Sequence, residues 1–555
     1  MEKDWWKGKI AYQIYPKSFK DSNGDGVGDL KGITEKLDYL QQLGIDILWL
    51  SPVYKSPFID QGYDISDYYA IDPLFGSMED MEELIAEGKK RGISIIMDLV
   101  VNHCSSHHEW FQKALADPDG PYADYFYFIE SDKEPNNWES YFGGSVWEPV
   151  PGTNKYYLHS FHKDQPDLNW QNPVLREEIY SMINWWLDKG IAGFRIDAII
   201  NIKKDLEWRS LPSDRENGLV PVPESLVNAQ SIEPFLQELN ERTFAKYNAF
   251  TVGEVFNETD EELHFFIGKD GVFSSIFDFK QTCLGQEGKG WFDHTLPTAE
   301  ELKESIFQAH ERADRIGVLS TIIENHDEPR GVSHYIAEGP VNDTSKKALG
   351  TIQVLRKGIP FIYQGQEIGM ENQVFESVED FDDIATINGY HVAKEAGLSE
   401  EEALAAIANY SRDNARTPMQ WSAEPGLGFS DGPAWLISPK PDYSINVEDQ
   451  EKDPDSILNY YRQLTALYRH PLYGNTIRFG DMIPAYRDRE NIIAFERRGD
   501  KRILVISNFQ NRQATLELPA PIKTLVLNNT AGLFQEGDQV LELVPYQSIV
   551  LELVE

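Results

Sequence analysis

Apolar residues in the first hundred positions follow two different spacings. Short apolar runs at Ile10–Phe19, Asp46–Pro52 and Ser94–His103 have the length of buried strands, whereas Leu30–Leu43 and Met78–Arg91 repeat apolar side chains every three or four residues, as amphipathic helices do. Strands that alternate with helices predict an α/β domain with a parallel sheet.

This alternation stops after the third strand and resumes near residue 174. Between Cys104 and Trp170 the chain is rich in Gly, Pro and aromatic residues. So long a segment is unusual as a simple connection inside a compact domain, so we expect an inserted subdomain over 104–170. Beyond it we predict helices at Val174–Lys189, Ile232–Tyr247, Leu302–Ala313, Ser345–Lys357 and Ile457–Tyr468, and strands around Arg195, Phe250–Val255, Phe273–Phe279, Ile322–Asp327 and Ile359–Gly365.

The last part of the chain has a different pattern. From about Asn475 the apolar residues fall into short alternating segments such as Ser548–Val554, and Gly499-Asp500 is typical of a hairpin turn. This pattern predicts a small C-terminal β-sandwich over 475–555.

Composition and charge narrow the possible partners. The 555 residues carry a formal net charge of -40, which disfavours binding to nucleic acid or to anionic membranes. The N-terminus lacks the basic and apolar regions of a signal peptide, no apolar run is long enough to span a membrane, and Cys104 and Cys283 are the two cysteines. We therefore expect a cytoplasmic, monomeric protein that acts on a neutral small molecule.

Three predicted strands carry acidic residues near their C-terminal ends. Arg195 and Asp197 share one face of their strand because they are two residues apart. Glu254 ends the next strand, and His326-Asp327 ends another. The C-terminal ends of the strands form the catalytic face of a (β/α)8 barrel. By itself the pair Arg195 and Asp197 favours a structural salt bridge over a catalytic role.

Four stretches together resemble the signature regions of the α-amylase superfamily of glycoside hydrolases: Asp98-Leu99-Val100-Val101-Asn102-His103, Gly193-Phe194-Arg195-Ile196-Asp197, Gly253-Glu254-Val255 and Asn325-His326-Asp327. A fifth, Gln165-Pro166-Asp167-Leu168-Asn169-Trp170, is similar to the signature of its oligo-1,6-glucosidase and α-glucosidase branch. The resemblance extends over essentially the whole chain. It implies a (β/α)8 TIM barrel formed by 1–103 and 171–474, with the inserted subdomain 104–170 after strand 3 and the C-terminal β-sandwich 475–555.

The resemblance also implies roles for individual residues. Asp197 would be the nucleophile, held ionised by Arg195, and Glu254 would be a general acid whose pKa is raised by partial burial. Asp327 would bind sugar hydroxyls and favour the transition state. The expected substrate-binding residues are Asp60, Tyr63, His103, Phe142, Phe161, Gln165, Arg195, His326 and Arg412, with Arg412 preferred over Arg416; Glu367 is expected near the entrance, and Glu371–Asn409 as a lid.

A loop after the first strand carries oxygen donors at alternate positions, a pattern that suits a hard cation. An EF-hand would require a Glu at loop position twelve, where this chain has Gly32. The family resemblance instead implies a structural calcium ion bound by Asp21, Asn23, Asp25, the Val27 carbonyl and Asp29; a turn without an ion is the alternative.

The implied activity is that of a retaining exo-acting α-glucosidase on short oligosaccharides of the maltose, isomaltose or sucrose type. Ala198 follows the nucleophile, and a small residue there goes with α-1,4 activity in this family, whereas Val goes with α-1,6 preference. The alternatives are a glucosyl transferase or sucrose isomerase, a trehalose-phosphate hydrolase, and an inactive binding protein. Segment 329–335 lacks the arginine-rich loop of the isomerases, no basic pocket for phosphate is evident, and all three catalytic carboxylates are present.

Overall fold

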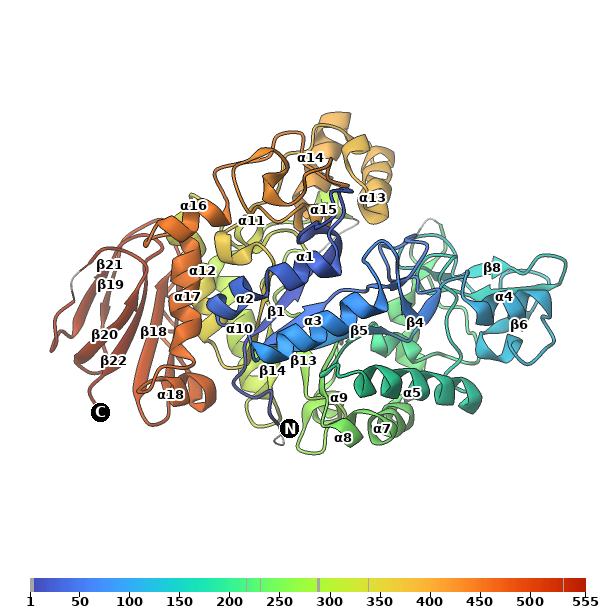
Figure 1. Cartoon of the computed structure of the whole chain (residues 1–555), viewed down its shortest axis with the longest axis horizontal. Helices are drawn as coiled ribbons and strands as arrows, with labels where there is room; N and C mark the ends of the chain where they lie inside the picture. Colours follow the sequence, from blue (N-terminus) through green and yellow to red (C-terminus); the bar gives the residue numbers. More distant parts are fainter. Residues whose placement is uncertain (1–3, 216, 230, 287–289, 338, 533) are drawn as a thin grey trace. The chain divides into compact units, whose positions relative to one another are not determined.

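The computed structural model describes the whole chain apart from residues 1–3, 216, 230, 287–289, 338 and 533 (Figure 1). Eight parallel strands form a closed barrel in the order β1-β15-β14-β13-β12-β10-β5-β2, which confirms the predicted fold class. The strands are β1 (Ala11–Ile14), β2 (Ile47–Leu50), β5 (Ser94–Val100), β10 (Gly193–Asp197), β12 (Phe250–Gly253), β13 (Ser275–Phe277), β14 (Leu319–Thr321) and β15 (Ile359–Tyr363).

The contacts divide the chain into two compact units, one with residues 49–86 and 94–276 and the other with residues 5–48, 87–93 and 277–555. In the first unit, β10 lies between β5 and β12, and Arg195 stands opposite both Asp98 and Val252. In the second, β15 pairs with both β1 and β14.

The predicted helices are present, and two of them are interrupted. The segment Leu30–Leu43 forms α1 (Leu30–Glu35) and α2 (Leu37–Leu43), and Ile232–Tyr247 forms α7 (Glu233–Arg242) and α8 (Phe244–Tyr247). The breaks fall at Lys36 and Thr243, whose backbones are not helical. The other predicted helices are α3 (Met78–Lys90), α5 (Pro173–Asp188), α10 (Ala299–Ala313), α12 (Asp343–Leu355) and α17 (Ile457–Leu467).

The prediction of a strand at Ile322–Asp327 is wrong, because β14 ends at Thr321. The Ile322 carbonyl accepts hydrogen bonds from the side chains of Gln281 and Arg356 instead of continuing a ladder. His326 and Asp327 therefore lie on a loop beyond the strand. The first strand is likewise shorter than predicted, since Pro16–Ser18 forms a 3-10 turn after β1.

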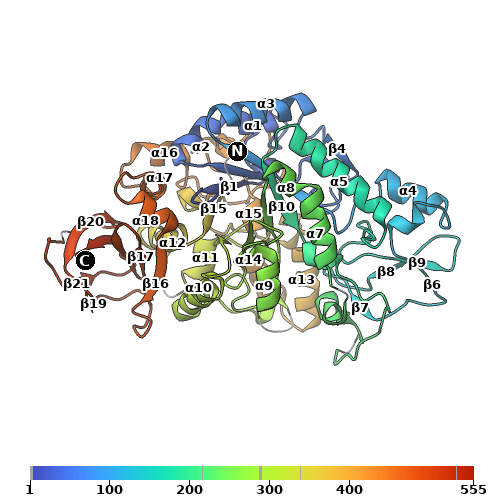
Figure 2. The same cartoon turned by 90° about the horizontal axis from the view of Figure 1, so that it is seen from below.

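The inserted segment contains a three-stranded antiparallel sheet in the order β6-β9-β8, made of β6 (Phe128–Glu130), β9 (Lys155–Leu158) and β8 (Trp147–Pro149). Helix α4 (Glu109–Ala116) lies beside this sheet (Figure 2), and its Phe111 ring packs edge-on against Tyr157 at 5.0 Å. Part of the segment that follows β10 joins this region, because β11 (Val220–Pro221) pairs with β7 (Trp138–Glu139).

The C-terminal region forms a five-stranded antiparallel sheet, β16-β17-β18-β22-β20, and a two-stranded sheet, β19-β21. Their facing side chains make one apolar core that includes Leu504, Leu541 and Leu551. A short helix, α18 (Gly474–Phe479), precedes them, so the first strand begins at Asp481, slightly later than predicted. The strands are β16 (Asp481–Ala485), β17 (Ile492–Arg498), β18 (Arg502–Asn508), β19 (Ala514–Glu517), β20 (Ile522–Asn528), β21 (Val540–Leu543) and β22 (Ser548–Leu553).

Glu367 does not lie at an entrance. Its side chain is fully buried and accepts hydrogen bonds from the Tyr12 and Tyr39 hydroxyls at 2.8 and 2.6 Å. It is a structural carboxyl that ties the end of β15 to β1 and α2. Among the described residues, no helix is long and apolar enough to cross a membrane.

Gly193 at the start of β10 is required by close packing. A Cβ atom at this position would lie 1.7 Å from the Phe250 carbonyl oxygen on the neighbouring strand. The glycine therefore lets β10 and β12 approach and sets the height at which Arg195 and Asp197 emerge.

Candidate active site

Arg195 is the centre of the site in the first unit. Its Nη1 lies 2.7 Å from Asp98 Oδ1 and 2.6 Å from Asp197 Oδ1, and its Nη2 lies 2.9 Å from Glu254 Oε2. Arg195 and Asp98 are completely buried, whereas the side chains of Asp197 and Glu254 keep some exposure. One guanidinium thus holds three carboxyls, two of which can reach a ligand.

Asp98 is a member of this cluster that the sequence reasoning gave no role. Its Oδ2 accepts hydrogen bonds from Trp49 Nε1 at 3.0 Å and from the Tyr63 hydroxyl at 3.1 Å. Asp98 is the first residue of the first signature stretch, and this position was the sequence signal that could have identified it as part of the site. Asp98 lies on β5 directly opposite Arg195 in the strand register, and from there it positions the guanidinium group.

The expectation that Arg195 would hold the pKa of Asp197 low is wrong for the free site. Burial raises the pKa of Asp197 well above that of an ordinary aspartate, and the charge of Glu254 adds to this, although Arg195 opposes it. Burial also raises the pKa of Asp98 to about 6. One guanidinium cannot compensate several buried negative charges, so Asp197 and Asp98 lose their protons less readily than ordinary aspartates.

The two oxygens of Glu254 have different surroundings. Oε2 accepts the Ala198 backbone N–H at 2.7 Å as well as the Arg195 contact. No hydrogen bond from a described residue reaches Oε1. Because donors already fill one side of Oε2, a proton on Glu254 is better placed on Oε1.

The backbone conformation of Ala198 makes its hydrogen bond to Glu254 possible. It has φ 42° and ψ 32°, the left-handed conformation, which turns its N–H towards Glu254. Residues without branching at Cβ tolerate this conformation better than Val or Ile does.

The predicted sugar-binding residues of the first unit form one hydrogen-bonded group. Gln165 Nε2 donates to Asp60 Oδ2 at 3.0 Å and lies 3.2 Å from His103 Nε2, which is also 3.2 Å from the Tyr63 carbonyl. Burial lowers the pKa of His103, so its imidazole is neutral at pH 7. The structure therefore brings Asp60, Tyr63, His103 and Gln165 together.

A neighbouring carboxyl holds the loop that carries Asp60 and Tyr63. Asp64 is buried and accepts the backbone N–H groups of Ile59 and Asp60 at 2.9 and 3.0 Å. Gln61 has a positive φ of 50°. These hydrogen bonds stabilise a turn that the loop would seldom adopt without them.

Phe142 and Phe161 lie on one aromatic wall of the inserted region. The Phe161 ring is 5.1 Å from His103 and 6.0 Å from Phe142, and it stacks on Tyr141 at 4.7 Å. The Tyr141 hydroxyl donates to Asn201 Oδ1 at 3.0 Å. Tyr141 was not predicted, although it directly precedes Phe142.

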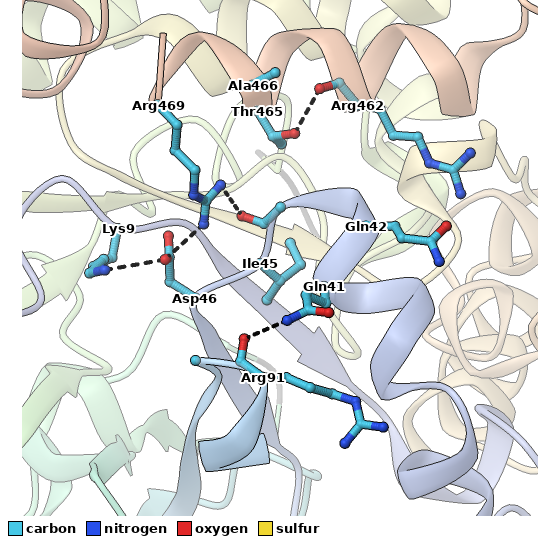
Figure 3. A pocket seen from close by; sticks show the side chains of 12 residues that line it. Lys9, Gln41, Gln42, Ile45, Asp46, Arg91, Arg462, Thr465, Ala466 and Arg469 are labelled. Atoms are coloured by element: carbon cyan, nitrogen blue, oxygen red, sulfur yellow. Dashed lines mark hydrogen bonds and ion pairs between the residues drawn. The ribbon is translucent and has the colours of Figure 1, made fainter. Parts of the chain in front are cut away.

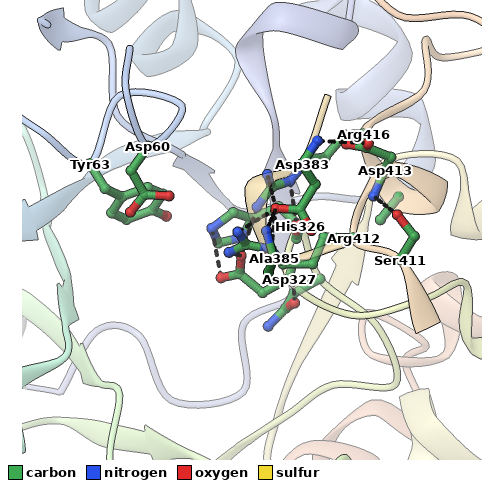
Figure 4. Close-up of polar contacts among 12 residues, drawn as sticks. Asp60, Tyr63, His326, Asp327, Asp383, Ala385, Ser411, Arg412, Asp413 and Arg416 are labelled. Carbon is green, nitrogen blue, oxygen red and sulfur yellow. Dashed lines mark hydrogen bonds and ion pairs between the residues drawn. The ribbon is translucent and has the colours of Figure 1, made fainter. Parts of the chain in front are cut away.

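The second unit holds the other predicted residues, which converge in Figure 4. Arg412 Nη1 and Arg416 Nη2 bind Asp327 Oδ1 at 3.0 and 2.9 Å. His326 Nε2 lies 3.1 Å from Asp327 Oδ2, and its Nδ1 is 2.8 Å from Gln13 Nε2. Both arginines contact Asp327, so these contacts do not decide between them and the preference for Arg412 over Arg416 stays a prediction.

Asp383 lies in the segment 371–409 and connects it to Arg412 and Arg416. Its Oδ1 lies 2.5 Å from Arg412 Nη2 and 3.8 Å from Arg416 Nη1. It is also the N-cap of α13 (Ile384–Glu395), whose first N–H groups bind its carboxylate. Helices α13 and α14 (Glu400–Tyr410) pack on a small apolar cluster of Phe375, Phe381 and Ile407. Asp383 had no distinguishing sequence signal, since it lies in a generally acidic stretch.

The proposed calcium ligands are engaged with one another. Asp21 accepts the N–H groups of Asn23 and Gly26 at 2.9 and 2.8 Å, and Asp29 caps α1 through the Gly32 N–H at 2.7 Å. The donor atoms have the oxygen chemistry that calcium prefers. In the part of the chain that the structure describes, no group of three or more His, Cys, Asp or Glu residues is placed to hold a metal ion. Calcium binding therefore stays a prediction.

The two arginines give Asp383 a measurable effect on stability. Burial alone would raise its pKa, but Arg412 and Arg416 lower it to about 2. Because the pKa of Asp383 is lower in the folded than in the unfolded protein, its ion pairs stabilise the fold above about pH 4, where the unfolded aspartate is ionised. This stabilisation is lost as the pH falls towards 2. The shift corresponds to about 2 kcal/mol.

We therefore expect Asp383→Asn to lower Tm by a few degrees at pH 7, with the difference from the native protein narrowing below pH 4. Thermal unfolding followed by circular dichroism at several pH values measures it. Glu376→Gln, which removes an exposed pair with Lys440, is the charge-matched control. A difference that does not change with pH would contradict the role of the ion pairs.

Comparisons with known proteins agree with this geometry. The family model for the α-amylase catalytic domain matches residues 13–472. An oligo-1,6-glucosidase from Bacillus cereus is 40% identical and a glucan 1,6-alpha-glucosidase from Streptococcus pneumoniae is 42% identical, each over 100% of both chains. The solved trehalulose synthase from Pseudomonas mesoacidophila is 38% identical, covers 99% of both chains and has a TM-score of 0.92. The chain belongs to the α-amylase family of glycoside hydrolases.

Proposed function

We propose that this protein is a retaining exo-acting α-glucosidase that removes terminal non-reducing α-linked glucose from short oligosaccharides. The observation that carries the proposal is the binding of Asp197 and Glu254 to opposite terminal nitrogens of one guanidinium. This shared partner keeps the two carboxyls close, and carboxyls about 5 Å apart are typical of retaining glycosidases. Relatives named oligo-1,6-glucosidase support the substrate class.

The chemistry follows from the surroundings of each carboxyl. Asp197 attacks the anomeric carbon, the glycosidic bond breaks, and Glu254 Oε1 gives its proton to the leaving oxygen. Glu254 then takes a proton from water, whose oxygen replaces Asp197 at the anomeric carbon, so both carboxyls return to their starting states. This step requires Asp197 as the carboxylate and Glu254 as the carboxylic acid once the substrate is bound.

Each unit also offers groups that are suited to sugar hydroxyls. Asp60, His103 and Gln165 offer hydrogen-bonding atoms in the first unit, and Asp327, oriented by two arginines, offers a carboxylate in the second. The Asp327 carboxylate would stabilise positive charge that develops on the sugar ring in the transition state.

Sucrose isomerisation is the rival activity on this scaffold, since the solved relatives include trehalulose and isomaltulose synthases. Segment 329–335 contains one arginine, Arg330, and it is buried against Glu324 Oε1 at 3.2 Å and the Gln364 carbonyl at 2.7 Å. It is thus committed to the protein interior and not available to redirect a released sugar. We favour hydrolysis for this reason.

Further proposals concern the ion, the location and the oligomeric state. We propose a calcium ion at the loop formed by Asp21, Asn23, Asp25, the Val27 carbonyl and Asp29, on the basis of its oxygen donors. A cytoplasmic monomer is proposed from the composition alone.

Loss of the nucleophile is expected to abolish hydrolysis without unfolding the chain. Asp197→Ala should show no glucose release from maltose, isomaltose or sucrose, while circular dichroism stays native. Glu254→Gln should reduce kcat by at least about 100-fold, and less on p-nitrophenyl α-glucoside, whose leaving group needs no proton. Equal losses on both kinds of substrate would exclude Glu254 as the acid, and near-normal turnover of Asp197→Ala would exclude the nucleophile.

Ala198 should influence linkage preference, and we expect the native enzyme to accept α-1,4 disaccharides. Ala198→Val adds bulk beside Asp197 and should shift the maltose-to-isomaltose ratio of kcat/KM towards isomaltose by about 10-fold, the usual scale for one or two methyl groups. Ala198→Gly is the control, because it keeps the left-handed backbone without adding bulk. An equal loss on both substrates in Ala198→Val would point to backbone strain instead of crowding.

If calcium occupies the loop, a chelator should lower Tm, because removing a ligand of the native state destabilises it. Metal analysis before and after chelation, with Asp25→Asn as a variant of the exposed ligand, measures this. Unchanged Tm and no bound metal would show that the hydrogen bonds alone hold the loop.

A further inference from the structure

His326 is fully buried in the second unit, and each nitrogen of its imidazole ring lies against a polar side chain. Nδ1 is 2.8 Å from the amide nitrogen of Gln13 on β1, and Nε2 is 3.1 Å from Oδ2 of Asp327 (Figure 4). A neutral imidazole carries one proton, on either nitrogen. The partners of the two nitrogens therefore decide which tautomer is present.

Both contacts favour the proton on Nε2. An amide nitrogen only donates hydrogen bonds, so Nδ1 accepts from Gln13, and Nε2 donates to the Asp327 oxygen. If the amide were reversed, Nδ1 would hold the proton. Nε2 would then either turn a lone pair towards Oδ2 or carry a second proton and a positive charge, and both are costly for a buried ring.

The tautomer matters because it supplies one of the bonds that orient Asp327. Arg412 and Arg416 bind Oδ1 at 3.0 and 2.9 Å, and His326 binds Oδ2. The Asp327 side chain keeps 33% exposure, so it can contact a ligand. With the proton on Nδ1 instead, a nitrogen lone pair would face Oδ2, and repulsion between two acceptors would turn the carboxyl away from its present direction.

The strand that carries Gln13 is fixed near both ends. Just before β1, Asp46 binds Lys9 Nζ at 3.2 Å (Figure 3) and accepts the Ile10 N–H at 3.1 Å. At Gln13 itself, the backbone carbonyl accepts the Gln364 N–H at 3.1 Å, directly after β15. The Gln13 amide is therefore presented from a backbone that hydrogen bonds hold in place.

Tyr15 restricts the same imidazole from a second direction. It follows Gln13 by two residues in extended backbone, and such residues share a face. Its ring stacks on His326 with the centroids 6.1 Å apart, and Arg416 lies over the Tyr15 ring at 5.7 Å. Tyr15 thus constrains the plane of the imidazole, while Gln13 determines which nitrogen carries the proton.

We propose that Gln13 is a positioning residue that keeps His326 in the Nε2–H tautomer and thereby aims the Asp327 carboxyl at a sugar hydroxyl. Gln13 is 2% exposed, so it acts through His326 from a buried position. The effect on catalysis rests on the glucosidase function proposed above, whereas the tautomer is a property of the protein without substrate.

The direct test is nuclear magnetic resonance of the full-length protein labelled with 15N in histidine, with the His326 signals identified by their loss in His326→Gln. We expect the native protein to show a neutral imidazole protonated on Nε2. Gln13→Met removes the amide donor at similar length, so the single tautomer should be lost. Gln13→Glu offers an acceptor to Nδ1, so both nitrogens should be protonated.

Kinetics on maltose separate positioning from a merely structural role. Gln13→Met should lower kcat by about 10-fold with a smaller change in KM, because Asp327 acts mainly in the transition state. Gln13→Glu keeps a proton on Nε2 and should lower kcat less than Gln13→Met. A structural role predicts the reverse order, since a buried carboxylate disturbs packing more than a thioether does.

Gln366→Met is the matched control, because it also removes a buried amide, one that bonds Gln353 and Tyr461 at 3.0 Å. It should leave the His326 signals and kcat unchanged. The proposal is overturned if native His326 is protonated on Nδ1, or if Gln13→Met keeps the native signals and kcat. A native protein without glucosidase activity would instead overturn the proposed function, and the nitrogen signals would still decide the tautomer.

Discussion

The sharing of one buried guanidinium by three carboxyls is the constraint on which the active site depends. Arg195 cannot neutralise Asp98, Asp197 and Glu254 together, so at least one of them is disfavoured as an anion. A glycosidase needs a carboxylate and a carboxylic acid side by side, and this imbalance of charge provides both from one cluster. Asp98 contributes by occupying the inner side of Arg195, which leaves Asp197 and Glu254 as the carboxyls of the cluster that keep some exposure.

The cluster in the second unit has a balanced ratio of charges instead. There two arginines face Asp327 and Asp383, and the low pKa of Asp383 keeps that carboxylate ionised. The contacts of both guanidinium groups with Oδ1 hold the Asp327 side chain in one orientation. The two clusters show how neighbouring charges, and not the residue type, decide whether an aspartate carries a proton.

The sequence predicted the barrel and the residues that gather around Arg195 and around Asp327, because both leave local signals. Alternating periodicity reveals strands and helices, and the signature stretches place Asp197, Glu254 and Asp327. What it could not predict depends on contacts far apart in the chain. Glu367 is buried because Tyr12 and Tyr39 meet it, β14 ends early because Gln281 and Arg356 take the Ile322 carbonyl, and the pKa of Asp197 reflects burial that no short motif reports.

The double role of Asp383 limits how this family member can exchange segments with its relatives. The same carboxylate begins α13 and contacts Arg412 and Arg416, so its position along the chain fixes both the helix and the arginines. Insertions near residues 396–399, between α13 and α14, leave this connection intact. One extra residue directly before Ile384 would shift the carboxylate out of reach of both guanidinium groups. Recombination that swaps the helical excursion is therefore compatible with function when the crossover points keep 383–386 and 411–416 from the same parent.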